Sequence, residues 1–302
     1  MDVTLVGLRV LREVAERGTF TAAAQALGYT QSAVSRQVAG LEQATGVLLF
    51  DRHPGGVRLT NPGRALLAHA VTALDALEAA DRELSGAADA SGRVRLGFIP
   101  AAGAVLVARA LATLSRQSPR IQVTTREGAT PSLLRALRAG ALDVALLSSR
   151  PPHRSPDADD PPLHAEPLLE DHLVLAVPAE GRFADRTGVT AQEIAGETWI
   201  AGTTGTDAPL LGIWPGLPGR PRVHHAARDW LTKLHLVAAG VGITTVPSML
   251  LSAIPPGVRL ITVDDLPEER RRVSLVRLPG STTPSTDALI HALRRHAADL
   301  AE

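Results

Sequence analysis

The segment GTFTAAAQALGYTQSAVSRQ, residues 18–37, decides how the N-terminal part of the chain folds. Its glycines and threonines are residue types that end and begin helices. Gly18 ends a first helix, and either Thr19 or Thr21 caps a second helix over residues 21–27. Short helices separated by such caps predict a helix-turn-helix.

A third helix follows a Gly-Tyr turn, is capped by Thr30 and covers residues 31–45. Val34, Val38 and Leu41 share one face of this helix and are expected to pack inward. The opposite face carries short hydrogen-bonding side chains, one arginine and one alanine: Ser32, Ser35, Arg36, Ala39 and Gln43. Such a face suits the major groove of DNA, where hydroxyl, amide and guanidinium groups meet base edges and phosphates. A plain solvated helix face fits the same geometry.

Residues 62–85 form one long helical pattern, with a proline at a favourable first-turn position. Apolar residues recur on a heptad spacing at Leu67, Ala70, Leu74, Leu77 and Leu84, and Asp81 interrupts the stripe. A helix of this length with an apolar stripe needs a partner. We expect the same helix of a second chain to be that partner; packing on the helix's own domain is the alternative.

Strands and helices alternate after a small, polar linker at residues 87–92. Buried strands are expected at 94–99, 121–125 and 142–147, with helices at 103–118 and 131–139 between them. This order predicts a doubly wound parallel sheet. A second small sheet is expected from residues 173–177, 198–201, 223–225, 242–246 and 258–263, before a last strand at 272–278 and a terminal helix from about residue 286.

Composition limits the class of protein. The chain has 302 residues, enough for two or three domains, and no cysteine, which excludes disulfides, thiolate metal sites and a cysteine nucleophile. Its formal net charge is zero, so bulk charge does not indicate nucleic-acid binding. The first residues lack the pattern of a secretory signal, and we expect a cytoplasmic protein without a membrane span. Lys233 is the only lysine, which we attribute to a GC-rich coding bias.

A run of spaced motif residues covers the first sixty-five positions or so: Gly18 to Ala24, Leu27, Gln31 to Gln37, Leu41-Glu42, Gly46, Leu49-Phe50, Arg52, Leu59-Thr60 and Gly63. This run resembles the winged helix-turn-helix of LysR-type transcription regulators. The resemblance implies that the third helix approaches DNA, with Gln31 and Arg36 on bases and the serines on phosphates, and that residues 50–60 form a wing. The candidate DNA-binding residues are therefore Thr21, Thr30, Gln31, Ser32, Ser35, Arg36, Gln37, Arg52 and Arg58. For Arg52, a structural ion pair is the alternative.

The rest of the chain is similar to the regulatory domain of the same family, through landmarks that include Gly97 to Pro100, Glu127-Gly128, Gly140 to Asp143 and Gly240 to Ile243. This resemblance implies the fold of periplasmic binding proteins, in which two β/α lobes enclose a ligand cleft. The expected fold class is α+β and multi-domain. The expected domains are a winged helix-turn-helix at 1–60, a linker helix and hinge at 61–91 and a regulatory domain at 92–302, with lobe one at 92–163 plus 269–302 and lobe two at 164–268.

Ligands in such folds lie at the carboxyl ends of strands, where helix N-termini offer free N–H groups. The candidate effector-binding residues are Pro100, Ala101, Ala102, Thr130, Thr203, Thr204, Thr206, His225 and Arg228. A turn or cap is the alternative for each threonine, and a plain surface position for His225. The family commonly has a serine or threonine where this chain has Ala101-Ala102, so we expect a more apolar pocket.

We expect a sequence-specific DNA-binding transcription regulator whose activity a small-molecule effector modulates. By resemblance to the family, it forms a dimer and then a homotetramer on an interrupted palindromic operator. The alternatives are a regulator with a degenerate, ligand-independent sensor and, less favoured, a solute-binding protein, which would need export. The sequence has no metal-binding histidine spacing, P-loop or Gly-x-Ser-x-Gly elbow, so no catalytic residue, metal or cofactor is expected.

Overall fold

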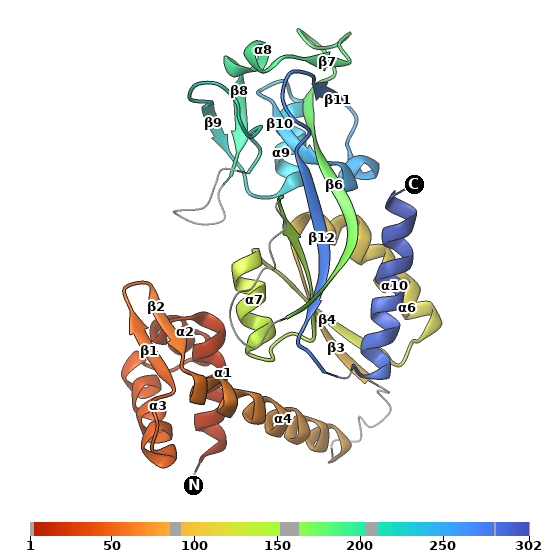
Figure 1. The fold of residues 1–302 in the computed structure, drawn as a ribbon. Helices are drawn as coiled ribbons and strands as arrows, with labels where there is room; N and C mark the ends of the chain where they lie inside the picture. Colours follow the sequence, from red (N-terminus) through yellow and green to blue (C-terminus); the bar gives the residue numbers. More distant parts are fainter. Residues whose placement is uncertain (1–2, 85–91, 152–162, 203–210, 281, 302) are drawn as a thin grey trace.

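The computed structural model describes residues 3–84, 92–151, 163–202, 211–280 and 282–301 (Figure 1). The N-terminal part contains α1 (Leu5–Arg17), α2 (Phe20–Leu27), α3 (Gln31–Thr45) and a hairpin of β1 (Phe50–His53) and β2 (Gly56–Leu59). Threonine caps begin the helices and left-handed glycines end them: Thr4, Thr19 and Thr30, then Gly18, Gly28 and Gly46. The predicted helix-turn-helix and its wing are confirmed.

The long helix α4 (Asn61–Leu84) follows the wing. Leu67, Ala70 and Leu74 of its apolar stripe are buried within the single chain, and Leu67 and Ala70 share an apolar cluster with Ala139 of the C-terminal part. Leu77 is 48% exposed. The first part of the apolar stripe therefore packs against the helix's own chain, as in the alternative considered above. Leu77 remains exposed, where a second chain can cover it.

Eight strands of the C-terminal part form one sheet. They are β3 (Gly92–Phe98), β4 (Ile121–Glu127), β5 (Val144–Ser149), β6 (His164–Pro178), β7 (Gly188–Val189), β10 (Thr244–Pro247), β11 (Val258–Val263) and β12 (Arg270–Arg277). Their order is β4-β3-β5-β12-β6-β11-β7, and β10 also pairs with β6. The strands β4, β3 and β5 are parallel, as expected.

The expectation of a separate second sheet is wrong, because β6 runs through both halves of the domain. This strand is 15 residues long. Its residues 164–172 pair with β12, and its residues 173–178 pair with β10 and β11. The strands β8 (Thr198–Ala201) and β9 (Arg222–Ala226) form a parallel pair of their own.

The described helices of the C-terminal part are α5 (Pro100–Ala102), the π-helical turn η1 (Gly103–Val107), α6 (Ala108–Gln117), α7 (Thr130–Arg138), α8 (Ala191–Ala195), α9 (Trp230–Ala238), the 3₁₀ helix η2 (Ser248–Ala253) and α10 (Pro284–Ala301). Around β5, α6 and α10 cover one face of the sheet and α7 covers the other. Val144 and Leu146 face the core beneath α6 and α10, whereas Ala145 and Leu147 face the core beneath α7 (Figure 1). None of the described helices is long and apolar enough to cross a bilayer.

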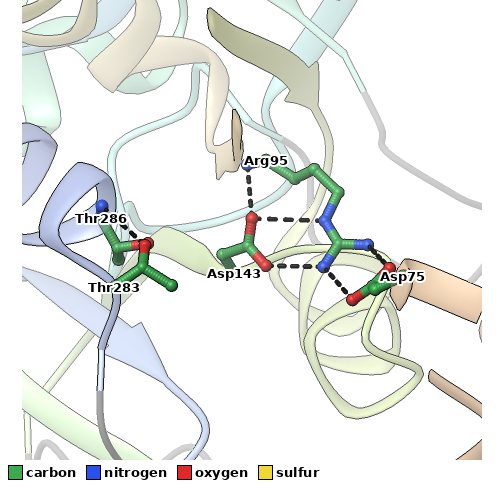
Figure 2. Close-up of polar contacts among 5 residues, drawn as sticks. All are labelled: Asp75, Arg95, Asp143, Thr283 and Thr286. Atoms are coloured by element: carbon green, nitrogen blue, oxygen red, sulfur yellow. Dashed lines mark hydrogen bonds and ion pairs between the residues drawn. The ribbon is translucent and has the colours of Figure 1, made fainter. Parts of the chain in front are cut away.

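Ion pairs connect the N-terminal part to this sheet. Arg95 of β3 lies between Asp75 of α4 and Asp143, which precedes β5 (Figure 2). Arg95 Nη1 and Nη2 donate to the Asp75 carboxylate at 3.1 and 3.2 Å, and Nη2 donates to Asp143 at 2.7 Å. Burial disfavours the charge of Arg95, but the two carboxylates outweigh it and raise the pKa of Arg95 above its ordinary value. Glu16 of α1 adds a second ion pair, with Arg126 of β4.

Figure 2 also shows how the last helix begins. The Thr283 hydroxyl oxygen accepts the backbone N–H of Thr286 at 3.2 Å, and the two threonine hydroxyls lie 2.9 Å apart. This local cap supplies an acceptor to the first turn of α10. The terminal helix expected from about residue 286 therefore starts two residues earlier, at Pro284.

Two glycines that follow helices test the packing of α4. Gly140 follows α7 with φ +63°, and a Cβ there would lie 2.5 Å from Cγ1 of Val71 on α4. Gly240 follows α9 with φ +77° and has nothing within 4 Å of an added Cβ. Gly240→Ala should lower the free energy of unfolding by about 1–2 kcal/mol, the cost of a left-handed alanine. Gly140→Ala should lower it by roughly 1–3 kcal/mol more, because α4 must move. Urea denaturation followed by circular dichroism measures both; equal losses would contradict the contact between α4 and Gly140.

Candidate DNA interface and effector cleft

The helix α3 presents polar side chains to solvent because its aliphatic face is buried. Val34 is fully buried, and Val38 and Leu41 are nearly so. Of the candidate residues on this helix, Gln31, Ser32 and Arg36 are exposed, whereas Ser35 and Gln37 are half-buried. At 100° per residue, Ser32, Ser35 and Arg36 fall within about 100° of one another around the helix. The structure therefore brings these three candidates together on one face, and Gln31 and Gln37 lie toward its two borders with the buried side.

The two threonine candidates occupy the first turns of α2 and α3. Thr30 is the N-cap of α3: its hydroxyl oxygen accepts the N–H of Ala33 at 3.2 Å and lies 3.1 Å from the hydroxyl of Ser32. Thr19, and not Thr21, caps α2 by accepting the N–H of Ala22 at 3.1 Å. This leaves Thr21 exposed in the first turn of α2.

The wing is held against the helices by backbone contacts. A Cβ on Gly56, whose φ is +130°, would lie 2.2 Å from the carbonyl oxygen of Gly18. The neighbouring N–H of Val57 donates to that same carbonyl at 2.8 Å. From α3, the Glu42 carboxylate accepts the N–H of Leu49 at 2.8 Å. Glycine at position 56 thus allows the hairpin to approach the turn between α1 and α2.

Both arginines of the wing are exposed. The Arg52 guanidinium lies 5.6 Å from the centroid of the Phe20 ring, which is a cation–π contact instead of the ion pair considered for it. Phe20 in turn packs edge-on against Phe50, with the ring centroids 6.1 Å apart. Arg58 pairs across the hairpin with Asp51 in the strand register. The wing therefore carries two exposed arginines, and Arg52 lines the same hollow as Ser35 and Ala39 of α3.

Four of the nine candidate effector-binding residues follow the carboxyl ends of parallel strands: Pro100, Ala101, Ala102 and Thr130. Pro100 follows β3 and Thr130 begins α7 just after β4, and these strands pair in register up to Phe98 and Glu127. Pro100 and Thr130 are half-buried. Ala101 and Ala102 are instead buried in an apolar cluster that includes residues of α9, β10 and η2. Apolar packing therefore fills the place where the family commonly has a hydroxyl.

The other five candidate effector-binding residues belong to β9 or to the segments that follow β8 and β9. His225 of β9 is half-buried and Arg228 is exposed. The N–H of Ala227 donates to the carbonyl of Ala201 at 3.0 Å, which holds this turn beside the end of β8. Thr203, Thr204 and Thr206 lie outside the described residues.

Lys233 is a further candidate effector-binding residue, which was not predicted from the sequence. It is 1% exposed, and its Nζ donates to the carbonyl of Leu211 at 2.8 Å and lies 4.5 Å from the centroid of the Trp230 ring. Burial lowers the pKa of Lys233 to about 8, against the opposing charge of Asp229. The sequence offers one signal for it, since a single lysine stands among thirty arginines, but coding bias explains that composition equally well.

The fold and the exposed helix define a class: DNA-binding regulators in which a winged helix-turn-helix precedes an effector-binding α/β domain. Residues 5–64 match the family described as bacterial regulatory helix-turn-helix protein, lysR family, and residues 87–298 match the LysR substrate binding domain. The chain belongs to the LysR family of bacterial transcription regulators. It is a DNA-binding transcription regulator with an effector-binding domain, as the resemblance implied.

Several known proteins are similar over most of the chain. The chain is 40% identical over 176 residues to a probable hydrogen peroxide-inducible genes activator of Mycobacterium xenopi, which covers 58% of this chain and 89% of that protein. It is 30% identical over 295 residues to the DNA-binding transcriptional dual regulator OxyR of Escherichia coli (strain K12), covering 95% and 93%. Full-length OxyR from Pseudomonas aeruginosa, in a cysteine-to-aspartate variant, has a TM-score of 0.61 at 22% identity and covers 98% of this chain and 95% of that chain. This last likeness supports the fold alone.

The buried ammonium of Lys233 makes stability depend on pH. The unfolded lysine keeps its ordinary pKa near 10.4, so between about pH 8 and 10.5 the unfolded chain binds the proton that the folded chain has lost. The free energy of unfolding should therefore rise with pH across this window, by up to about 3 kcal/mol. Lys233→Met should remove that rise. Urea titrations at pH 7.5, 9 and 10.5 measure it, and the same slope in both proteins would show that Lys233 does not titrate in this range.

Proposed function

We propose that the chain binds an interrupted palindromic operator as a dimer or tetramer, and that a small molecule in the cleft between two lobes modulates this binding. The observation that carries the DNA part is the exposed polar face of α3, which is held outward by Val34, Val38 and Leu41. Ser32, Ser35 and Arg36 are the central contacts in this proposal, with Gln31, Thr21 and Thr30 beside them. Arg52 and Arg58 then reach the minor groove or the backbone from the wing.

The proposal keeps the domain boundaries expected from the sequence: DNA binding by residues 1–60, linker and hinge over 61–91, and effector binding by 92–302, in lobes 92–163 plus 269–302 and 164–268. We assign Pro100, Thr130, His225 and Arg228 to the cleft, with Lys233 added to its second lobe. The regulator acts in the cytoplasm, where it meets DNA, and has no catalytic activity. A sensor that no longer binds a ligand is the second candidate, supported by the buried Ala101 and Ala102.

We further propose that the effector is bound without covalent chemistry. Two relatives are named for hydrogen peroxide or as OxyR, and a solved OxyR carries a substituted cysteine. Peroxide sensing by a thiol requires a cysteine that is oxidised to a sulfenic acid or a disulfide. The present chain has no cysteine. Thiol oxidation therefore cannot be its signal, and in our proposal the effector is recognised by shape, charge and hydrogen bonding.

The DNA-binding face is tested by Arg36→Ala. A bidentate arginine–base contact is worth about 1–3 kcal/mol, so the Kd for DNA from upstream of the chain's own gene should rise roughly 5- to 150-fold. Fluorescence anisotropy at fixed salt measures this Kd. Arg109→Ala, on the exposed face of α6, is the matched control and should leave the Kd unchanged. Equal Kd values for Arg36→Ala and wild type would remove Arg36 from the interface.

The thiol-free mechanism is tested with hydrogen peroxide. Brief treatment of the purified regulator with peroxide should change its Kd for the same DNA by less than about twofold, because no residue can form a sulfenic acid or a disulfide. Anisotropy before and after treatment measures the change, with a cysteine-containing OxyR as the positive control. A large shift in Kd that reverses on reduction would refute this part of the proposal.

A further inference from the structure

A cavity of about 380 Å³ lies where the wing, α4 and α7 meet. This volume falls within the range of small-molecule sites, roughly 300–1,000 Å³. The cavity is lined by Arg135 and Arg138 from the second half of α7, whereas the cleft candidate Thr130 begins that helix. It shares Arg58 with the proposed DNA contact of the wing, and none of its lining residues is among the cleft candidates.

The cavity has a strongly positive lining. Four arginines contribute to it, Arg58 from the wing, Arg64 from α4, and Arg135 and Arg138 from α7, whereas none of its described lining residues is aspartate or glutamate. Arg64 Nη1 donates to the backbone carbonyl of Leu59 at 2.9 Å, and Arg135 Nε donates to the carbonyl of Glu16 at 3.3 Å. Arg64 also donates to the side-chain oxygen of Asn61, so in the described part of the chain these acceptors of Arg64 and Arg135 are neutral oxygens. Clustered guanidinium groups are suited to carboxylates and phosphates.

Part of the cavity lining is apolar. Leu67 and Val71 of α4 contribute to it together with Ala139, and these three residues belong to or pack against the N-terminal core. An inorganic anion would pair with the guanidinium groups and leave the apolar part of the lining without a partner. A ligand with a carboxylate at one end and an apolar body at the other satisfies both halves.

We propose that this cavity binds a small organic carboxylate with an apolar, aromatic-sized body, separately from the cleft between the lobes. The carboxylate lies among the arginines, and the body lies against Leu67 and Val71. Because the walls come from both the DNA-binding part and the regulatory domain, such a ligand touches both at once. The proposal stands independently of whether the cleft binds an effector.

The charge requirement is tested with two probes of the same shape. Isothermal titration calorimetry on the full-length protein compares 2-naphthoate with its neutral analogue 2-naphthamide. We expect naphthoate to bind and naphthamide to bind at least tenfold more weakly, because only naphthoate pairs with the guanidinium groups. No heat from naphthoate, or equal affinity for both probes, would overturn the proposal.

The location is tested with two substitutions and their controls. Ala68→Phe places a ring in the cavity from the exposed side of α4 and should abolish naphthoate binding; Arg135→Gln removes one charge and should raise its Kd about tenfold. Ala112→Phe and Arg109→Gln, on the exposed face of α6, are the matched controls and should bind as wild type does. If the Ala68 variant does not fold, as judged by circular dichroism, the Arg135 variant decides. Unchanged affinity in Arg135→Gln, or loss of binding in Thr130→Val instead, would assign naphthoate to another site and refute the proposal.

Discussion

Burial of the aliphatic side of α3 is the constraint on which the rest of the molecule depends. Val34, Val38 and Leu41 each contribute about 1.5–3 kcal/mol when they leave water, so together they fix the rotation of the helix about its own axis. That rotation alone decides that Ser32 and Arg36 face solvent. The wing then follows, because Glu42 on the same helix holds the backbone of Leu49. A polar substitution on the aliphatic side of α3 would disturb the exposed polar face of this helix and the wing together.

The helices of the N-terminal part could be predicted almost to the residue, because their boundaries are written locally in threonine caps and left-handed glycines. The three parallel strands could be predicted to within about two residues, since a buried strand shows as a short apolar run. The order in which the strands pair in the sheet could not be predicted from the sequence. Strand β6 is long because it pairs with three partners from distant parts of the chain, and nothing within residues 164–178 reports those pairings. Register between remote strands is a tertiary property.

The candidate sites show the same difference between features that local sequence predicts and features that depend on residues remote in sequence. The outward face of α3 follows from helical periodicity, so its residues could be named in advance, and Gln31 and Gln37 lie at its two borders. The ion pairs of Arg95 and the burial of Lys233 depend on residues that are remote in sequence, and charge type alone does not reveal a partner. The alanines after β3 are buried in one apolar cluster with residues of β10 and η2, and this burial could not be predicted from the sequence.

The ion pair between Asp75 and Arg95 has a mechanical consequence. From Asp75 back to its first residue, α4 extends over about 21 Å at 1.5 Å per residue. With Glu16 of α1 also held by Arg126, two ion pairs at separate points fix the DNA-binding part against the sheet. Any rotation of that part relative to the sheet must therefore break at least one of these two pairs.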